Sequence, residues 1–195
     1  MKKAIVKMRN SSSMPLSIET PRLLIRNFRD QDIDDIVEFS SDEDYDLVRN
    51  LDWEPTVEGV KRYFESHRDI VPGDYPNWLT LIIELKVERK VVGVVGIGFK
   101  EKEKRQAMIG WLLGVKHQRQ GIATEAVKSF VTYCFRNIGL HRIFARTGRS
   151  NTRSWRLMER IGMRREAHFR ESHKVYDQWD DEFIYAILSK EWKLS

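Results

Sequence analysis

The chain contains several apolar-rich runs that are separated by charged or polar segments. Residues 22–28, 78–85 and 90–98 are such runs, and the charged residues 88–89 between the last two predict a hairpin. A further run, residues 107–113, follows a charged turn. This pattern predicts one early strand and then a meander of three antiparallel strands.

The strongest periodicity in the chain lies in residues 123–138. Apolar residues recur there at spacings of three and four, namely Ala123, Val127, Phe130, Val131, Cys134, Phe135 and Ile138. This spacing places them on one face and predicts an amphipathic helix, which Gly139 ends as a C-cap. Because this helix connects the strand at 107–113 with the next predicted strand, residues 141–146, we expect those two strands to be parallel.

Weaker patterns complete the prediction of secondary structure. Helices are expected at residues 30–40, 56–70 and 151–161, and strands at residues 163–170 and 182–188. Strands and helices are mixed along the chain, and consecutive strands dominate before residue 113. The fold class is therefore predicted to be α/β, with an antiparallel first half.

The composition indicates one globular domain. The chain has 195 residues, of which 41% are hydrophobic and 32% are charged. Residues 1–15 are polar and are expected to be disordered, which leaves residues 16–195 as the domain. Apolar runs are too short for a bilayer span or a secretory signal, and the single cysteine, Cys134, is expected to be a buried thiol. We therefore expect no membrane partner and a cytoplasmic location.

The loop before the helix at 123–138 carries the first candidate chemistry. A helix N-terminus offers unpaired N–H groups and the positive end of the helix dipole, so it attracts phosphate groups. Gly121 allows close approach, Ala123 keeps the next turn slim, and Arg119 adds a positive charge. The loop has neither the ending of a nucleotide-triphosphate P-loop nor the three glycines of a dinucleotide site. Taken alone, a helix that opens on a single glycine favours an ordinary loop over a phosphate site.

Several ordered motifs give this loop a context. Gln118, Gly121 and Ala123 match the Gln/Arg-x-x-Gly-x-Gly/Ala motif of the GNAT superfamily of acyl-CoA N-acyltransferases, which the chain resembles. Further matches are Ile109–Leu113, His141–Ile143, Asn151 with Ser154, and Ile161–Met163. The two ends of the chain resemble the RimJ/RimL-type branch through Glu19–Arg26, Gln178–Asp181 before Tyr185, and Glu191-Trp192.

The resemblance implies a mixed, mostly antiparallel sheet flanked by helices, in which the parallel strands at 107–113 and 141–146 splay apart around the pantetheine arm. It implies acetyl-CoA as the co-substrate, without a metal. The implied cofactor-binding residues are Leu112, Leu113, Gln118, Arg119, Gln120, Gly121, Ile122, Ala123, Thr124, Asn151 and Ser154. The implied reaction transfers an acetyl group to a primary amine, and the branch suggests a protein N-terminus as the acceptor.

The chain departs from the family pattern at two catalytic positions. Where many members have a tyrosine acid, this chain has Met158, so we expect Ser154 to protonate the leaving sulfur. The alternative is that Ser154 only packs or caps its helix. Where some members have a carboxylate, this chain has Met108. The general base is therefore unassigned, and the candidates are a water relay, Glu54, Glu84 or Asp181.

The acceptor side leaves more alternatives open. Trp53 is expected to border the amine site, although a core or lid position is an equal alternative. The acidic residues 42–46 keep a small-molecule amine, such as a polyamine, aminoglycoside or amino sugar, as the second expectation. The five histidines show no metal spacing, so no metal is expected. Homodimers are common on this scaffold, and nothing in the sequence decides the oligomeric state.

The basic residues raise a different class of function. The formal net charge is +5, and Arg149, Arg153, Arg156 and Arg160 form a stripe on the predicted helix at 151–161. By helical angle this stripe lies opposite Asn151 and Ser154, so we expect a solvated face that points away from the chemistry. Recognition of an acidic protein or of ribosomal RNA is the weaker interpretation. We expect no direct contact with nucleic acid, but a non-catalytic CoA-binding or RNA-associated module stays the rival to the enzyme.

Overall fold

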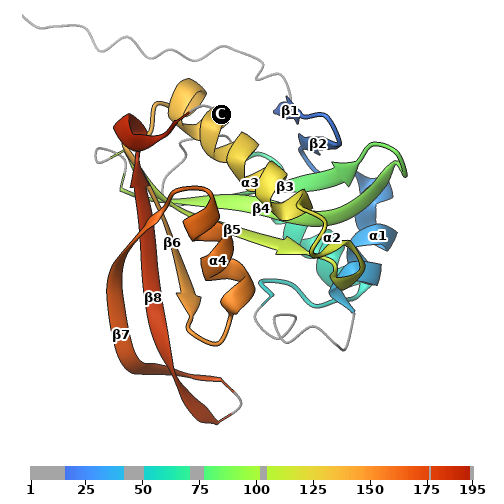
Figure 1. The fold of residues 1–195 in the computed structure, drawn as a ribbon. Coiled ribbons are helices and arrows are strands. Elements are labelled where there is room, and N and C mark those ends of the chain that lie inside the picture. Colours follow the sequence, from blue (N-terminus) through green and yellow to red (C-terminus); the bar gives the residue numbers. More distant parts are fainter. Residues whose placement is uncertain (1–15, 42–50, 71–76, 102–104, 176, 194–195) are drawn as a thin grey trace, which may run out of the picture.

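The computed structural model describes residues 16–41, 51–70, 77–101, 105–175 and 177–193. Eight strands form one sheet in the order β1-β2-β3-β4-β5-β6-β8-β7 (Figure 1). The strands are β1 (Ser17–Glu19), β2 (Leu23–Arg26), β3 (Trp78–Leu85), β4 (Lys90–Glu101), β5 (Gln106–Leu113), β6 (Arg142–Gly148), β7 (Arg164–Val175) and β8 (Gln178–Leu188). The α-helices are α1 (Ile33–Ser40), α2 (Val57–Ser66), α3 (Ile122–Tyr133) and α4 (Thr152–Arg160).

The sheet has an apolar layer on each face. On one face, α3 and α4 cover a core that includes Leu81, Val127 and Phe130. On the other face, α1 and α2 cover a smaller core that includes Ile36 and Phe64. Apolar residues on both faces explain why β3 and β4 are almost continuously apolar in sequence.

The predicted meander and crossover are both confirmed. Strands β3, β4 and β5 pair in antiparallel fashion, and β5 pairs with β6 in parallel after the α3 crossover. The parallel pairing covers only three residue pairs and ends at Met108 and Phe144. Because both strands continue, to Leu113 and Gly148, they separate beyond that point. We call this gap the β5–β6 opening; it confirms the expected α/β fold with a splayed parallel pair.

Helix α3 follows the periodicity read from the sequence. Val127, Phe130 and Val131 are fully buried, and the helix continues through a π-helical turn, Cys134–Ile138, before Gly139 ends it in a left-handed conformation. The Cys134 side chain is fully buried, as predicted. Burial raises the pKa of its thiol, so this side chain acts as a small apolar group.

The structure differs from the prediction mainly at the two edges of the sheet. Strand β1 was not predicted, because three residues of polar and half-buried character carry no periodic signal. Strands β7 and β8 extend beyond the predicted ranges 163–170 and 182–188 and form a long hairpin (Figure 1). Most of β7 is exposed, so its pairing depends on backbone hydrogen bonds that leave no apolar pattern. The predicted disordered segment 1–15 and the acidic residues 42–46 lie outside the described residues.

Candidate active site

The loop between β5 and α3 is held by its own side chains. It passes through a 3-10 turn, Val115–His117, before the helix begins. Gln118 Nε2 donates to the carbonyl of Leu113 at 2.9 Å, and Gln120 Nε2 donates to the carbonyl of Lys116 at 3.0 Å. Two of the residues predicted to bind the cofactor therefore set the path of the backbone.

The backbone of this loop is shaped for an anion. Arg119 and Gly121 have left-handed φ angles of 61° and 78°, and Gly121 is the residue before the helix. Within the described chain, the N–H groups of Ile122, Ala123 and Thr124 have no hydrogen-bond acceptor. Left-handed residues beside a helix N-terminus turn such N–H groups into a concave anion site. The loop therefore fits a phosphate group.

Arg22 comes from the start of the sheet to the same loop. Its Nη1 donates to the carbonyl of Gln120 at 2.8 Å, and its Nε donates to Glu125 Oε2 at 2.6 Å. Burial tends to raise the pKa of Glu125, but hydrogen bonds from Thr20 and Arg22 outweigh it and lower that pKa. The ionised Glu125 thus holds a second guanidinium beside the loop.

Two arginines of α4 also reach the loop. Arg153 Nη1 donates to Gln118 Oε1 at 2.7 Å, and Arg160 Nη1 donates to Thr124 Oγ1 at 3.2 Å. The prediction that the whole basic stripe points away from the chemistry is therefore wrong. Helix α4 packs beside α3, so part of its polar face meets the loop instead of solvent.

Asn151 and Ser154 lie at the N-terminus of α4. Asn151 is the N-cap, and its Oδ1 accepts a hydrogen bond from the Ser154 N–H at 3.2 Å. The Ser154 side chain is half-buried, and its Oγ forms no hydrogen bond with the described part of the protein. Met158 is 1% exposed and belongs to the core. Of these three residues, only Asn151 and Ser154 retain polar atoms that a ligand could use.

Glu84, one candidate base, forms an ion pair with Arg26 away from the pocket. Its Oε2 accepts from Arg26 Nε at 2.7 Å, and Arg26 also forms a bidentate pair with Asp32 at 2.7 and 2.8 Å. Arg26 and Asp32 are 4% and 2% exposed. This network fixes the start of α1 to the sheet and does not line the pocket described below.

Asp181, another candidate base, holds a bulge in the β7–β8 hairpin. It accepts hydrogen bonds from the backbone N–H of Glu171 at 3.0 Å and from His168 at 2.6 Å, and Arg149 lies at 3.4 Å. These groups, the Glu171 N–H first, lower the pKa of Asp181 to about 2. A carboxylate so stabilised is a poor proton acceptor near neutral pH.

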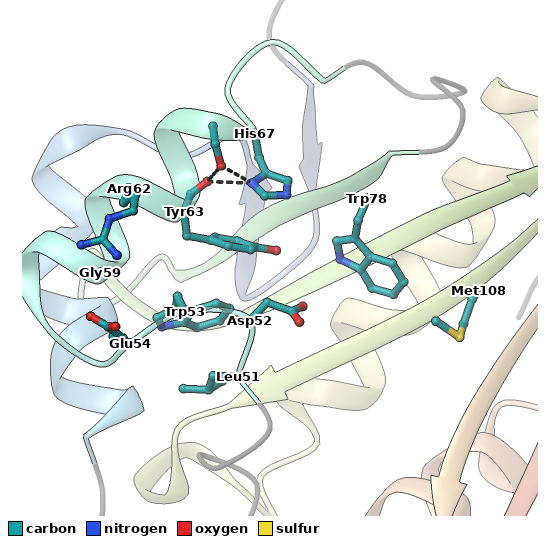
Figure 2. A pocket seen from close by; sticks show the side chains of 11 residues that line it. Leu51, Asp52, Trp53, Glu54, Gly59, Arg62, Tyr63, His67, Trp78 and Met108 are labelled. Atoms are coloured by element: carbon teal, nitrogen blue, oxygen red, sulfur yellow. Dashed lines mark hydrogen bonds between the residues drawn. The ribbon is translucent and has the colours of Figure 1, made fainter.

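A pocket of about 920 Å³ lies on the α1–α2 face of the sheet (Figure 2). Residues Leu51–Glu54, just before α2, form one wall, and Tyr63 and His67 of α2 form another. Met108 also lines the pocket, at the point where β5 and β6 part. The pocket therefore extends toward the β5–β6 opening. Trp53 lines this pocket, and its place at the amine site stays a prediction.

Trp78 forms a flat wall of the pocket over a floor of glycines. A Cβ at Gly96 or Gly98 would lie 2.3 Å from the Trp78 indole, and one at Gly110 would lie 3.3 Å from it. The missing side chains let the indole lie directly on β4 and β5. Replacement of these glycines by larger residues would displace Trp78, so the floor fixes this wall.

The opposite wall is also fixed in place. The Tyr63 hydroxyl and Thr80 Oγ1 share a hydrogen bond of 3.0 Å, and the Tyr63 ring stacks on His67 with centroids 4.2 Å apart. His67 Nδ1 lies 2.7 Å from the Tyr63 carbonyl. Because a carbonyl only accepts, we assign the proton to Nδ1, which leaves Nε2 as an acceptor.

Several pocket residues were not identified from the sequence, namely Asp52, Tyr63, His67 and Trp78. They come from separate segments, and no spacing links them. The only signal in the sequence was the closely spaced glycines of β4 and β5. Such glycines indicate that another group packs closely on the strands, but they do not show which group it is.

No three His, Cys, Asp or Glu side chains come together as a metal site in the described parts of the chain. The expectation of a reaction without a metal stays a prediction. None of the helices that the structure describes is long and apolar enough to cross a membrane.

Comparison with known proteins identifies the family. The model for the Acetyltransferase (GNAT) domain matches residues 22–164, which is more than half of the chain. The chain belongs to the GNAT acetyltransferase family. It is therefore an N-acetyltransferase, and the resemblance read from its motifs is confirmed. GNAT domains use acetyl-CoA, which agrees with the fit of the loop to a phosphate group.

Individual relatives support this assignment. The chain is 32% identical to "Uncharacterized N-acetyltransferase YnaD" of Bacillus subtilis (strain 168), over 91% of this chain and 99% of the relative. It is 24% identical to the "[Ribosomal protein uS5]-alanine N-acetyltransferase" of Escherichia coli (strain K12), over 93% and 95%. A solved GNAT-family acetyltransferase from Bacillus anthracis matches with a TM-score of 0.75 and 31% identity, covering 90% of this chain and 100% of that chain.

Proposed function

We propose that this GNAT acetyltransferase transfers an acetyl group from acetyl-CoA to the α-amine of a protein N-terminus, as a single domain over residues 16–195. One observation supports the proposal: the β5–β6 opening lies between an aromatic pocket, which Met108 lines, and a loop after Leu113 whose backbone fits an anion. The E. coli relative, which is named for acetylating an alanine of ribosomal protein uS5, supports a protein acceptor. The cytoplasmic location and a homodimer stay predictions.

In the proposal, the loop holds the pyrophosphate of the donor. Its free N–H groups at Ile122–Thr124, together with Gln120 and Gly121, face the anion, and Arg119 adds positive charge. Leu112 and Leu113 lie on the part of β5 that no longer pairs with β6, so their backbone groups can serve the pantetheine arm. When bound, acetyl-CoA supplies the acetyl group as an activated thioester.

Ser154 and Asn151 serve the reacting end of the donor. The Asn151 side chain caps α4 through its Oδ1, which leaves its amide N–H groups to donate to the pantetheine arm. The Ser154 hydroxyl has no partner in the described protein and is free to donate its proton at the leaving sulfur. Since Met158 has no proton to give, the acid role falls to Ser154.

Ser154→Ala tests that role. We expect kcat to fall by about a hundredfold, the lower end of the range for a positioned general acid. The KM for acetyl-CoA should change little, because the loop that binds phosphate is intact. Steady-state release of free CoA thiol measures both constants. Thr152→Ala, an exposed position in the same turn of α4, is the control. An unchanged kcat in Ser154→Ala would remove this residue from the acid role.

A small-molecule amine is the second candidate acceptor. The observation that favours it is that two carboxylates, Asp52 and Glu54, line one concave pocket, which suits a small molecule with more than one positive charge. A panel of N-terminal peptides, polyamines, aminoglycosides and amino sugars, analysed by thiol release and mass spectrometry, separates the two. We expect acetylation of the α-amine of peptides. Tight CoA binding with no acetylation of any member would instead indicate a non-catalytic module.

A further inference from the structure

Asp52 is an unpaired carboxylate in the wall of the pocket. Within the described residues it forms no hydrogen bond or ion pair, whereas Glu38 on the same face pairs with Lys90 at 2.7 Å. Its position is exposed to the pocket, so its charge is available to a ligand.

The direction of Asp52 distinguishes it from Glu54. In Figure 2 the Asp52 carboxylate and the Tyr63 hydroxyl both point toward the side on which Trp78 lies, and Met108 lies beyond Trp78. The Glu54 carboxylate points the opposite way, toward the end of the pocket with Arg62. Burial raises the pKa of the Tyr63 phenol, and the negative charge of Asp52 raises it further. The charge of Asp52 therefore acts on the Tyr63 hydroxyl.

The aromatic rings around Asp52 are held rigidly. Trp78 rests on its glycine floor, and Tyr63 is fixed by Thr80 and packs against Trp53 with centroids 5.1 Å apart. His67 and Trp53 cover the Tyr63 ring, so Tyr63 offers its hydroxyl oxygen, whereas Trp78 offers the face of its indole. The face of a tryptophan attracts cations, and a rigid ring binds them with little loss of side-chain entropy. A carboxylate beside these groups adds a full negative charge to the same position.

The Asp52 carboxylate lies away from the reacting end of the pocket. Met108 marks the end next to the β5–β6 opening, Trp78 comes next and reaches over Gly110 of β5, and Asp52 and Tyr63 lie on the far side of Trp78 (Figure 2). A cation held here cannot be the amine under attack, because that amine has to be neutral and close to the opening. The subsite suits a second positive group on the same acceptor.

We propose that Asp52, Tyr63 and Trp78 form a subsite for a second cation of the acceptor, so that the enzyme prefers N-terminal peptides with a lysine or arginine directly after the first residue. This inference rests on the proposed function. The reacting α-amine lies toward Met108, and the basic side chain lies between the Asp52 carboxylate, the Tyr63 hydroxyl oxygen and the face of Trp78. The subsite determines specificity and takes no part in bond making.

Matched peptides test the preference. One peptide begins Ala-Lys and the other begins Ala-norleucine, which has the same apolar stem without the charge. We expect kcat/KM to be about tenfold higher for the lysine peptide, mainly through KM. In Asp52→Asn the ratio should fall close to one. Glu58→Gln, an exposed acid at the start of α2 outside the pocket lining, should keep the ratio.

Other outcomes overturn the inference. If an active enzyme shows equal kcat/KM for both peptides, the subsite does not exist, and the proposed function is unaffected. If the preference for the lysine peptide is lost in Glu54→Gln and kept in Asp52→Asn, Glu54 and not Asp52 binds the second cation, and the inference is wrong. If putrescine is acetylated far better than the lysine peptide, the second cation belongs to a polyamine, and the peptide assignment is wrong.

A binding experiment tests the subsite independently of acetylation. Choline and its neutral carbon isostere, neohexyl alcohol, are titrated calorimetrically into the full chain. We expect binding of choline at least tenfold tighter than that of the alcohol, and loss of this difference in Asp52→Asn and in Trp78→Leu. Equal binding of the two compounds would contradict the subsite, whether or not the enzyme acetylates peptides. A lack of peptide acetylation would contradict only the proposed function.

Discussion

Gly121→Val should lower the affinity for acetyl-CoA by at least about a hundredfold. Gly121 has a φ of 78°, a conformation that costs a β-branched residue of the order of 1–3 kcal/mol. Even a Cβ at this position would lie 3.4 Å from Arg22 Nη2, and the valine methyl groups would extend over the free N–H groups at the start of α3. The substitution therefore both strains the loop and blocks the approach of a phosphate. Isothermal titration calorimetry with acetyl-CoA measures the loss.

Gly139→Val is the matched control for backbone strain. Gly139 ends the same helical segment with a φ of 76°, and a Cβ there would meet nothing within 4 Å. We expect a comparable loss of thermal stability in both variants but normal acetyl-CoA binding in Gly139→Val. If Gly121→Val binds acetyl-CoA normally while remaining folded, the pyrophosphate site lies elsewhere in the protein.

Arg26→Ala should lower the free energy of unfolding by about 3–5 kcal/mol, because it leaves two carboxylates without their cation in a largely buried position. The side chains of Arg26, Asp32 and Glu84 are only 5%, 3% and 15% exposed. Water can therefore replace the guanidinium only in part, and the remaining negative charges repel each other. Chemical denaturation monitored by circular dichroism measures the change.

Lys86→Ala provides the comparison for this effect. Lys86 Nζ pairs with Glu19 Oε1 at 2.8 Å, but both side chains are well exposed, at 34% and 70%. An exposed ion pair contributes about 0–1 kcal/mol, so this variant should be nearly as stable as the parent protein. A loss of less than about 1 kcal/mol in Arg26→Ala would mean that the surrounding structure relaxes and admits water.

Much of the fold could be predicted because its signals are local. The apolar face from Ala123 to Ile138 predicted α3, and the runs at 78–85, 90–98 and 107–113 predicted the meander. Side chains three or four residues apart on a helix share a face whatever the rest of the chain does. Strand β1 and the outer parts of β7 and β8 lack such a signal, because their pairing uses backbone groups that every sequence has.

The candidate site was only half predictable for the same reason. The sequence correctly predicted a helix N-terminus with a glycine at its start, since the periodicity and the glycine are both local signals. The arginines that surround it, Arg22, Arg153 and Arg160, come from segments far away in the chain. The direction of the arginine stripe was predicted from the helical angles within α4 alone. That prediction could not include the loop before α3, which the long side chains of Arg153 and Arg160 reach.

The sequence by itself determined the family and the α/β class, and it predicted the phosphate-binding role of the loop before α3. All three depend on short motifs whose conformation is set by adjacent residues. Only the tertiary structure decided that Asp52, Tyr63 and Trp78 share one pocket, that Glu84 and Asp181 are occupied by buried or bulge-forming contacts, and that β5 and β6 part at Met108. These features arise where separate segments meet, and the geometry of such meetings depends on the packing of the whole sheet and its helices.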